Sequence, residues 1–201
     1  MNEEVVLVAG LWMPAALMAP LGARLARAGF RPRRFAYSGR QSLEGAIERL
    51  ADFTRGRAPH FVGHSLGGVL IFDALERYRE LAAGRIVLIG APVTGCLAGR
   101  RLAAWGVGRW MLGASATRWQ DRAARWQRAE PLGVIAGTRA FGLGRMLGVL
   151  PGENDGVVRV EETTVQGMAE HVLLREGHSM LAVSRRVSAL AERFLRAGRF
   201  A

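Results

Sequence analysis

The sequence of 201 residues contains no lysine, so all 28 of its basic residues are arginines. Only 17 residues are acidic, which leaves a formal net charge of +11. The absence of lysine excludes a phosphate-binding P-loop, which requires Gly-Lys-Ser/Thr. A GC-rich coding bias is one interpretation of the arginines, and attraction to anionic lipid headgroups, acidic acyl substrates or nucleic acid is the other. No signature of a nucleic-acid-binding module is present, and we expect no specific nucleic-acid partner.

Cysteine and histidine are also scarce. Cys96 is the single cysteine, which excludes an internal disulfide and fits a reducing compartment. Neither Cys96 nor the four histidines show the spacing of a metal site. No nicotinamide-binding fingerprint follows the first predicted strand. We therefore expect no metal and no cofactor.

Long apolar runs are lacking, because Pro14 and Pro20 interrupt the first apolar stretch before it could span a bilayer. The chain begins Met1-Asn2-Glu3-Glu4, which is acidic where a secretory signal would be basic. We therefore expect a cytoplasmic protein. Half of the residues are hydrophobic, so residues 1–201 can form a single domain with a sizeable core.

Short apolar runs alternate with stretches of helical periodicity along most of the chain. The predicted strands are 5–9, 33–37, 60–64, 85–89, 132–136 and 169–175, and the predicted helices are 20–28, 42–54, 66–81 and 181–194. This alternation predicts βαβ units, hence the α/β class with a mostly parallel central sheet and helices on both faces. Ligands of such sheets bind at the carboxyl ends of the strands.

Residues 93–130 break the alternation and contain four of the five tryptophans, Trp105, Trp110, Trp119 and Trp126. Arg118, Arg122 and Arg125 fall on one helical stripe, which predicts a small helical insertion. One interpretation is a lid that meets lipid or a long acyl chain. The other is a helix that packs on the sheet through its tryptophans and leaves its arginines in water.

Ser65 lies at the centre of a Gly-x-Ser-x-Gly sequence between a predicted strand and a predicted helix. A serine at the apex of such a tight turn adopts a strained backbone, and side chains at Gly63 or Gly67 would collide with the turn. The turn exposes the hydroxyl of Ser65 and places the Leu66 N–H at a helix N-terminus, where it can stabilise an oxyanion. An ordinary serine in a tight turn is the alternative interpretation.

The sequence Gly-His-Ser-Leu-Gly-Gly resembles the α/β-hydrolase superfamily, and this form of the motif is common among its lipases, esterases and small acyl hydrolases. A nucleophilic serine needs a histidine base, and the histidine needs an orienting carboxylate. The resemblance implies the order serine, acid, histidine, with each on a loop after a different strand. Ser65, Asp155 and His178 satisfy this order. Asn-Asp-Gly-Val-Val followed by Gly-His-Ser is similar to small bacterial lipase-like hydrolases.

The resemblance also implies a second oxyanion donor on the loop after the first strand. That loop usually opens with His-Gly in the superfamily, whereas this chain has Ala9-Gly10. A backbone donor needs no particular side chain, so the N–H of Leu11 or Trp12 can serve. A plain strand-to-helix turn is the alternative interpretation of Gly10.

Other residues compete for the acid and the base. Glu153 is the main rival for the acid. The alternative interpretation of Asp155 is that it forms the turn and has no catalytic role. Glu161 and Glu162 are also nearby in the sequence, and Asp121 lies in the predicted insertion. Among the histidines, we expect His64 to be at most a supporting residue, and His60 and His171 to pack or to hydrogen-bond locally.

We therefore predict a serine hydrolase that cleaves a carboxylic ester or thioester through an acyl-enzyme. The partner expected is a small-molecule ester or acyl substrate, with peripheral contact to an anionic membrane as a further candidate. The predicted substrate-binding residues are Trp12, Met13, Leu143 and Met146, with Leu147 beside them. An acyltransferase with the same triad and a catalytically inert binding module remain alternatives.

Overall fold

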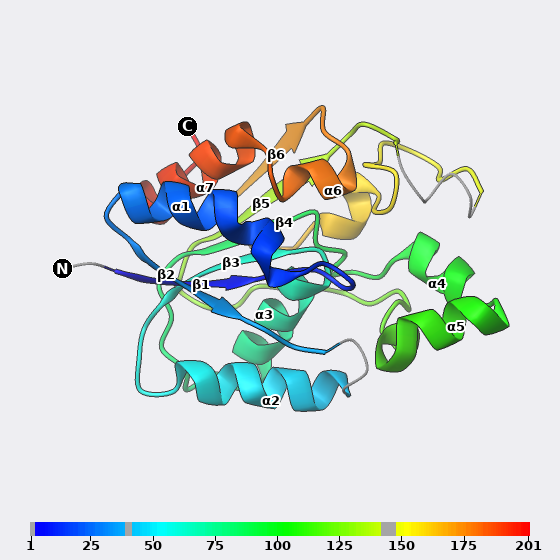
Figure 1. Ribbon diagram of the computed structural model, residues 1–201, viewed down its shortest axis with the longest axis horizontal. Helices are drawn as coiled ribbons and strands as arrows, with labels where there is room; N and C mark the ends of the chain where they lie inside the picture. Colours follow the sequence, from blue (N-terminus) through cyan, green and yellow to red (C-terminus); the bar gives the residue numbers. More distant parts are fainter. Residues whose placement is uncertain (1–2, 39–41, 142–147) are drawn as a thin grey trace.

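The computed structural model describes residues 3–38, 42–141 and 148–201. Six strands form one parallel sheet in the order β2-β1-β3-β4-β5-β6 (Figure 1). The strands are β1 (Glu4–Val8), β2 (Arg31–Phe35), β3 (His60–His64), β4 (Ile86–Ile89), β5 (Leu132–Gly137) and β6 (Glu170–Leu174). The predicted α/β class and parallel sheet are confirmed.

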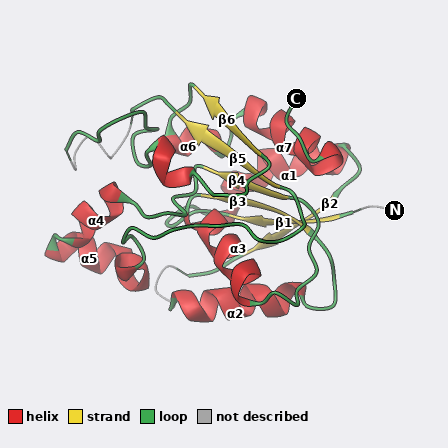
Figure 2. Cartoon of the chain, turned by 180° about the vertical axis from the view of Figure 1, so that it is seen from behind, coloured by secondary structure: helices red, strands yellow, loops and turns green. Residues whose placement is uncertain are grey.

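Helices cover both faces of this sheet, as Figures 1 and 2 show from opposite sides. One face packs against α2 (Leu43–Thr54) and α3 (Leu66–Arg77), and the other packs against α1 (Ala19–Arg27) and α7 (Arg185–Ala197). The inner strands β3, β4 and β5 are buried along their whole length. A strand buried on both faces needs apolar residues without alternation, which explains the continuous apolar runs of the sequence.

Most predicted helix boundaries agree with the structure to within a few residues. The Ser42 side chain accepts a hydrogen bond of 3.0 Å from the Gly45 N–H and so begins α2 as predicted. The last helix starts later than predicted, because residues 178–181 form a separate turn of helix, α6 (His178–Leu181), and Ser184 caps α7. The loop predicted for residues 176–180 is therefore wrong from His178 onward.

Residues 93–130 contain a helical pair, α4 (Leu97–Ala103) and α5 (Gly106–Leu112), followed by the 3₁₀ helix η2 (Gly113–Thr117). The helical stripe predicted from Arg118, Arg122 and Arg125 is wrong, because residues 118–131 run as irregular chain, with one bridge from Arg125 to Gln166. We call residues 118–131 the return strap.

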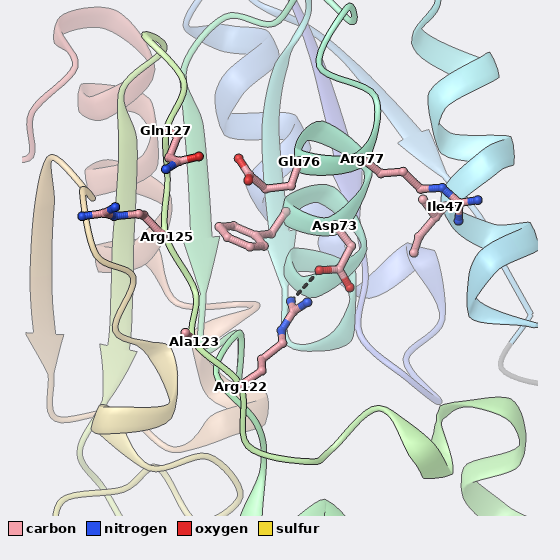
Figure 3. A pocket seen from close by; sticks show the side chains of 9 residues that line it. Ile47, Asp73, Glu76, Arg77, Arg122, Ala123, Arg125 and Gln127 are labelled. Carbon is pink, nitrogen blue, oxygen red and sulfur yellow. Dashed lines mark hydrogen bonds and ion pairs between the residues drawn. The ribbon is translucent and has the colours of Figure 1, made fainter.

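The return strap is tied to helix α3 through one carboxylate. Arg118 donates to both oxygens of Asp73, at 2.9 and 3.1 Å, and Arg122 pairs with the same carboxylate (Figure 3). Trp119 and Trp126 of the strap are buried, whereas Trp105 and Trp110 of the helical pair are exposed. The four tryptophans thus divide between a core role and a surface role.

Candidate active site

Ser65 forms the junction between β3 and α3, at the carboxyl end of the sheet. Its backbone has φ 53° and ψ −127°, in the positive-φ region that costs a non-glycine residue free energy. A Cβ on Gly67 would overlap the carbonyl groups of Val8 and Ala9, and one on Gly63 would lie 2.6 Å from the Gly68 nitrogen. Both glycines are therefore required by close backbone approach, as the motif predicts.

A chain of two hydrogen bonds links Ser65 to His178 and Asp155. His178 Nε2 lies 3.0 Å from Ser65 Oγ, and His178 Nδ1 lies 2.7 Å from Asp155 Oδ2. A carboxylate oxygen can only accept, so Nδ1–H donates to Asp155 and Nε2 is left free to accept the Ser65 proton. The distances are within the range required for proton transfer between a nucleophile and its base.

Asp155 is fixed by its own turn. One carboxylate oxygen, Oδ1, accepts from the N–H groups of Val157 (3.0 Å) and Val158 (2.7 Å), which leaves Oδ2 for His178. The backbone carbonyl of Asp155 accepts from the His178 N–H at 2.9 Å. The two residues are thus joined through both backbone and side chain, and Asp155 is a turn former and the partner of His178 at once.

Gly90, at the end of β4, leaves room for this pair. Its φ of 53° favours glycine, and a Cβ there would lie 3.3 Å from Asp155 Oδ2 and 3.1 Å from Leu181 Cδ1. The sequence analysis missed this residue, although Gly-Ala-Pro after an apolar strand was a signal for a constrained turn at the carboxyl edge.

The competing acids lie elsewhere. Glu153 is exposed, and its backbone carbonyl rather than its side chain takes part in the turn. Glu161 and the buried Glu162 both pair with Arg159, and Asp121 pairs with Arg100. Asp155 is the only one of the candidate acids that hydrogen-bonds His178 among the described residues.

Two of the other histidines make local hydrogen bonds, as expected. His60 lies 3.1 Å from a Glu3 oxygen and accepts from the Arg85 N–H, and His171 lies 3.1 Å from the Thr163 hydroxyl.

His64 has a larger role than the sequence suggested. Its Nε2 donates to the His178 carbonyl at 3.0 Å, and the two imidazole rings lie 4.8 Å apart. Burial is the main cause, and the neighbouring His178 the second, of a His64 pKa lowered to about 3. His64 is therefore neutral and supports His178 through this hydrogen bond and ring contact. No sequence signal connects these two residues, which are 114 positions apart.

The loop after β1 passes directly beside the serine. A Cβ on Gly10 would lie 2.9 Å from Ser65 Cβ, so this position also requires glycine. The Tyr37 hydroxyl donates to the Ala9 carbonyl at 3.1 Å, and burial raises the pKa of Tyr37. Tyr37 thus anchors the loop, a contact that the sequence did not predict. Although Ala9-Gly10 replaces the usual His-Gly, the loop still packs directly against Ser65.

The structure places the predicted oxyanion donors around this contact. Leu66 is the first residue of α3, so its N–H has no partner within the helix. Leu11 and Trp12 follow Gly10, and Trp12 has a φ of 59°. The Trp12 indole donates to the Met111 carbonyl of α5 at 3.1 Å, which connects the loop to the helical pair.

The predicted substrate-binding residues have different surroundings. Half of the Trp12 side chain is exposed, whereas Met13 is half-buried and packs against the core beneath α1. Leu143, Met146 and Leu147 lie outside the described residues. The structure therefore describes only Trp12 and Met13 of this set.

Two further findings concern the described residues alone. They contain no group of three or more His, Cys, Asp or Glu side chains that could hold a metal ion. None of their helices combines the length and apolar character needed to cross a membrane.

No protein-family model and no curated protein matches this sequence. Solved structures do match. The pyrethroid hydrolase PytH is 15% identical, with a TM-score of 0.67 over 98% of this chain and 99% of that protein. An esterase from Thermogutta terrifontis is 14% identical, with a TM-score of 0.67 over 98% of this chain and 90% of that protein. Mouse α/β hydrolase domain-containing protein 10 is 13% identical, with a TM-score of 0.67 over 98% and 89%.

Proposed function

We propose that this protein, which has the α/β-hydrolase fold, is a serine hydrolase that cleaves a carboxylic ester or thioester. One observation carries the proposal: Ser65 sits on a strained strand-to-helix turn and is the first member of the hydrogen-bonded series Ser65, His178, Asp155. The esterase and the pyrethroid hydrolase that share the fold support the same class of reaction.

The proposal gives a role to each member of the series. His178 Nε2 takes the Ser65 proton as Oγ attacks the carbonyl carbon, and the imidazolium is stabilised by Asp155 through Nδ1–H. The tetrahedral intermediate collapses when His178 returns the proton to the leaving alcohol or thiol. Water, activated by His178 in the same way, then hydrolyses the acyl-enzyme and regenerates Ser65.

The oxyanion would be held by the backbone N–H of Leu66 together with that of Leu11 or Trp12. Support comes from the helix N-terminus at Leu66 and from the close approach of Gly10 to Ser65. Each donor of this kind is worth about 3–4 kcal/mol in the transition state.

The finer assignments belong to the same proposal. Residues 1–201 would form one catalytic domain in which the helical part of residues 93–130, α4 and α5, acts as a lid. The acyl chain would lie against Trp12 and Met13; Leu143 and Met146, which the sequence also predicts to bind it, lie outside the described residues. A cytoplasmic location is supported by Cys96, a buried thiol that has no cysteine partner in the sequence.

The decisive experiment is covalent labelling with a fluorophosphonate probe. Wild type should be labelled, and Ser65→Ala and His178→Ala should not, because both the nucleophile and its base are required. Asp155→Asn should label much more slowly, while Glu153→Gln, the matched acid control, should label like wild type. A folded wild-type protein that stays unlabelled would overturn the proposal in favour of an inert binding module.

Chain-length preference tests the substrate class. Rates on nitrophenyl esters of increasing acyl length should rise from acetyl toward longer chains, because Trp12 and Met13 are apolar. Equal rates on acetyl and long-chain esters would refute the acyl-chain assignment but not the hydrolase.

A further inference from the structure

Exposed apolar side chains gather at one end of the molecule. Ten large hydrophobic residues are exposed among those described: eight lie in the three segments that follow β1, β4 and β5, Met180 lies in α6 after β6, and Leu173 lies in β6 itself. We call these eight the apolar rim: Trp12, Leu17, Trp105, Val107, Trp110, Met111, Phe141 and Val149. Trp110 is 75% exposed and Val107 72%, so these side chains are not partly packed core residues.

Contacts between the three segments make the rim continuous. The Trp12 indole bonds the Met111 carbonyl of α5, and Arg101 of α4 donates to the Val149 carbonyl at 3.1 Å. Phe141 adjoins the loop of Asp155, since a Cβ on Gly156 would overlap its carbonyl oxygen. The helical pair lies at the carboxyl ends of the strands, at the right of Figure 1. These contacts place Trp12, Phe141 and the helical pair at the edge of the sheet where Ser65 also lies.

The same segments contain arginine but no acidic residue. Residues 9–18, 97–117, 138–141 and 148–150 hold four arginines, Arg100, Arg101, Arg109 and Arg139, among 38 residues. At the average of the chain, 17 in 201, about three acidic residues would be expected in a stretch of this length. The nearest acids in sequence are Asp121, which pairs with Arg100, and Glu153.

We infer that the apolar rim docks the protein on an anionic lipid bilayer. Tryptophan is favoured at the membrane interface because its ring is apolar and its N–H is polar. Arginines beside it gain from the negative potential of anionic headgroups. A protein partner that covered the tryptophans would need an acidic surface to match the exposed Arg109 and Arg139, whereas an anionic bilayer presents negative charge across its whole surface.

Docking in this orientation faces the Ser65 site toward the lipid. The inference that the substrate is a lipid acyl ester drawn from that bilayer rests on the proposed hydrolase activity. The docking itself rests only on the exposed side chains and their charge.

Vesicle flotation tests the docking. Wild type should float with vesicles of phosphatidylcholine mixed with phosphatidylglycerol and not with phosphatidylcholine alone. The double variant Trp105→Ser/Trp110→Ser should lose about tenfold or more in partitioning, because two large apolar side chains no longer leave water. The double variant Arg109→Gln/Arg139→Gln should lose about twenty-fivefold in partitioning, at about fivefold for each arginine.

A matched control separates the rim from the general positive charge. Arg27→Gln/Arg31→Gln removes two exposed arginines from the end of α1 and the start of β2, at the opposite end of the strands from the rim. This variant should float like wild type. Equal losses in the rim variants and the control, or no flotation of wild type, would overturn the inference.

Failure of the docking and failure of the proposed function give different results. Ser65→Ala should float like wild type, because the serine is not part of the rim. Wild type that labels with fluorophosphonate but does not float would refute the docking alone. Wild type that floats but does not label would refute the hydrolase and leave the docking in place.

Discussion

The buried His64 should make the stability of the folded protein depend on pH, because its imidazole is not protonated in the folded protein near neutral pH. Its folded pKa is about 3, against an ordinary value of 6.5, and the charged or titratable groups that face it are His178 and Asp155. The unfolded chain therefore binds a proton at this site that the folded protein excludes. The resulting stability is fully present above the unfolded pKa and is lost as the pH falls from about 6.5 toward 3.

The magnitude follows from the two pKa values. At about pH 5, His64 is almost fully protonated in the unfolded chain and neutral in the folded protein. The free energy of unfolding is therefore about 2 kcal/mol lower at this pH than at neutral pH. His64→Gln removes the titration while its amide N–H can still donate to the His178 carbonyl. Between about pH 7.5 and pH 5, the free energy of unfolding should therefore fall by about 2 kcal/mol less in this variant than in wild type.

Urea unfolding at these two pH values measures the effect, with the free energy of unfolding extrapolated to water. His64→Phe serves as the companion variant, because it also removes the titration but leaves the His178 carbonyl unpaired. It should be less stable than His64→Gln by about 1–3 kcal/mol at both pH values. Equal acid sensitivity of wild type and both variants would refute the assignment of His64 as a buried neutral group.

Three further predictions concern the residues that hold the fold. Gly67→Ala should cost more than about 4 kcal/mol in thermal unfolding, because a Cβ would overlap the rigid Val8 carbonyl. Asp73→Ala should lower the free energy of unfolding in urea by about 2 kcal/mol or more, since the largely buried Arg118 would lose all three of its hydrogen bonds to Asp73. Cys96 should be unreactive toward a disulfide reagent until urea unfolds the chain, because burial raises its pKa to about 12.

Each of these predictions has a control that isolates its cause. Gly106→Ala places a Cβ in open space and should change stability by less than about 1 kcal/mol. Glu48→Ala breaks an exposed pair with Arg77 and should cost less than about 1 kcal/mol. Reaction of native Cys96 at the rate of the unfolded chain would contradict its burial.

The parts of the fold that local sequence determines could be predicted. Buried parallel strands need continuous apolar residues, and the Ser65 turn needs glycines at fixed offsets, so both leave strong signals within a few residues. The order of Ser65, Asp155 and His178 came from the family resemblance, and the structure brings these three residues together.

The contacts that hold the site in place could not be predicted in the same way. The Tyr37 hydroxyl on the Ala9 carbonyl and the His64 imidazole on the His178 carbonyl both end on backbone atoms. A backbone carbonyl is present at every residue, so nothing in the sequence marks which one a distant side chain will reach. Only the assembled sheet, with β1, β3 and the α6 turn at one edge, brings these partners together.

The return strap shows why helical spacing misled at residues 118–126. Spacing of three and four residues stabilises a helix only when one face can be buried, and α4 and α5 already occupy the helical part of this insertion. Arg118 and Arg122 share the carboxylate of Asp73, while Trp119 and Trp126 pack into the core from a turn and from irregular chain. These tertiary contacts exceed the few tenths of a kcal/mol per residue that separate helix from coil. The strap packs the ring of Trp119 against Gly99 of α4, while Trp105 and Trp110 of the helical pair remain exposed.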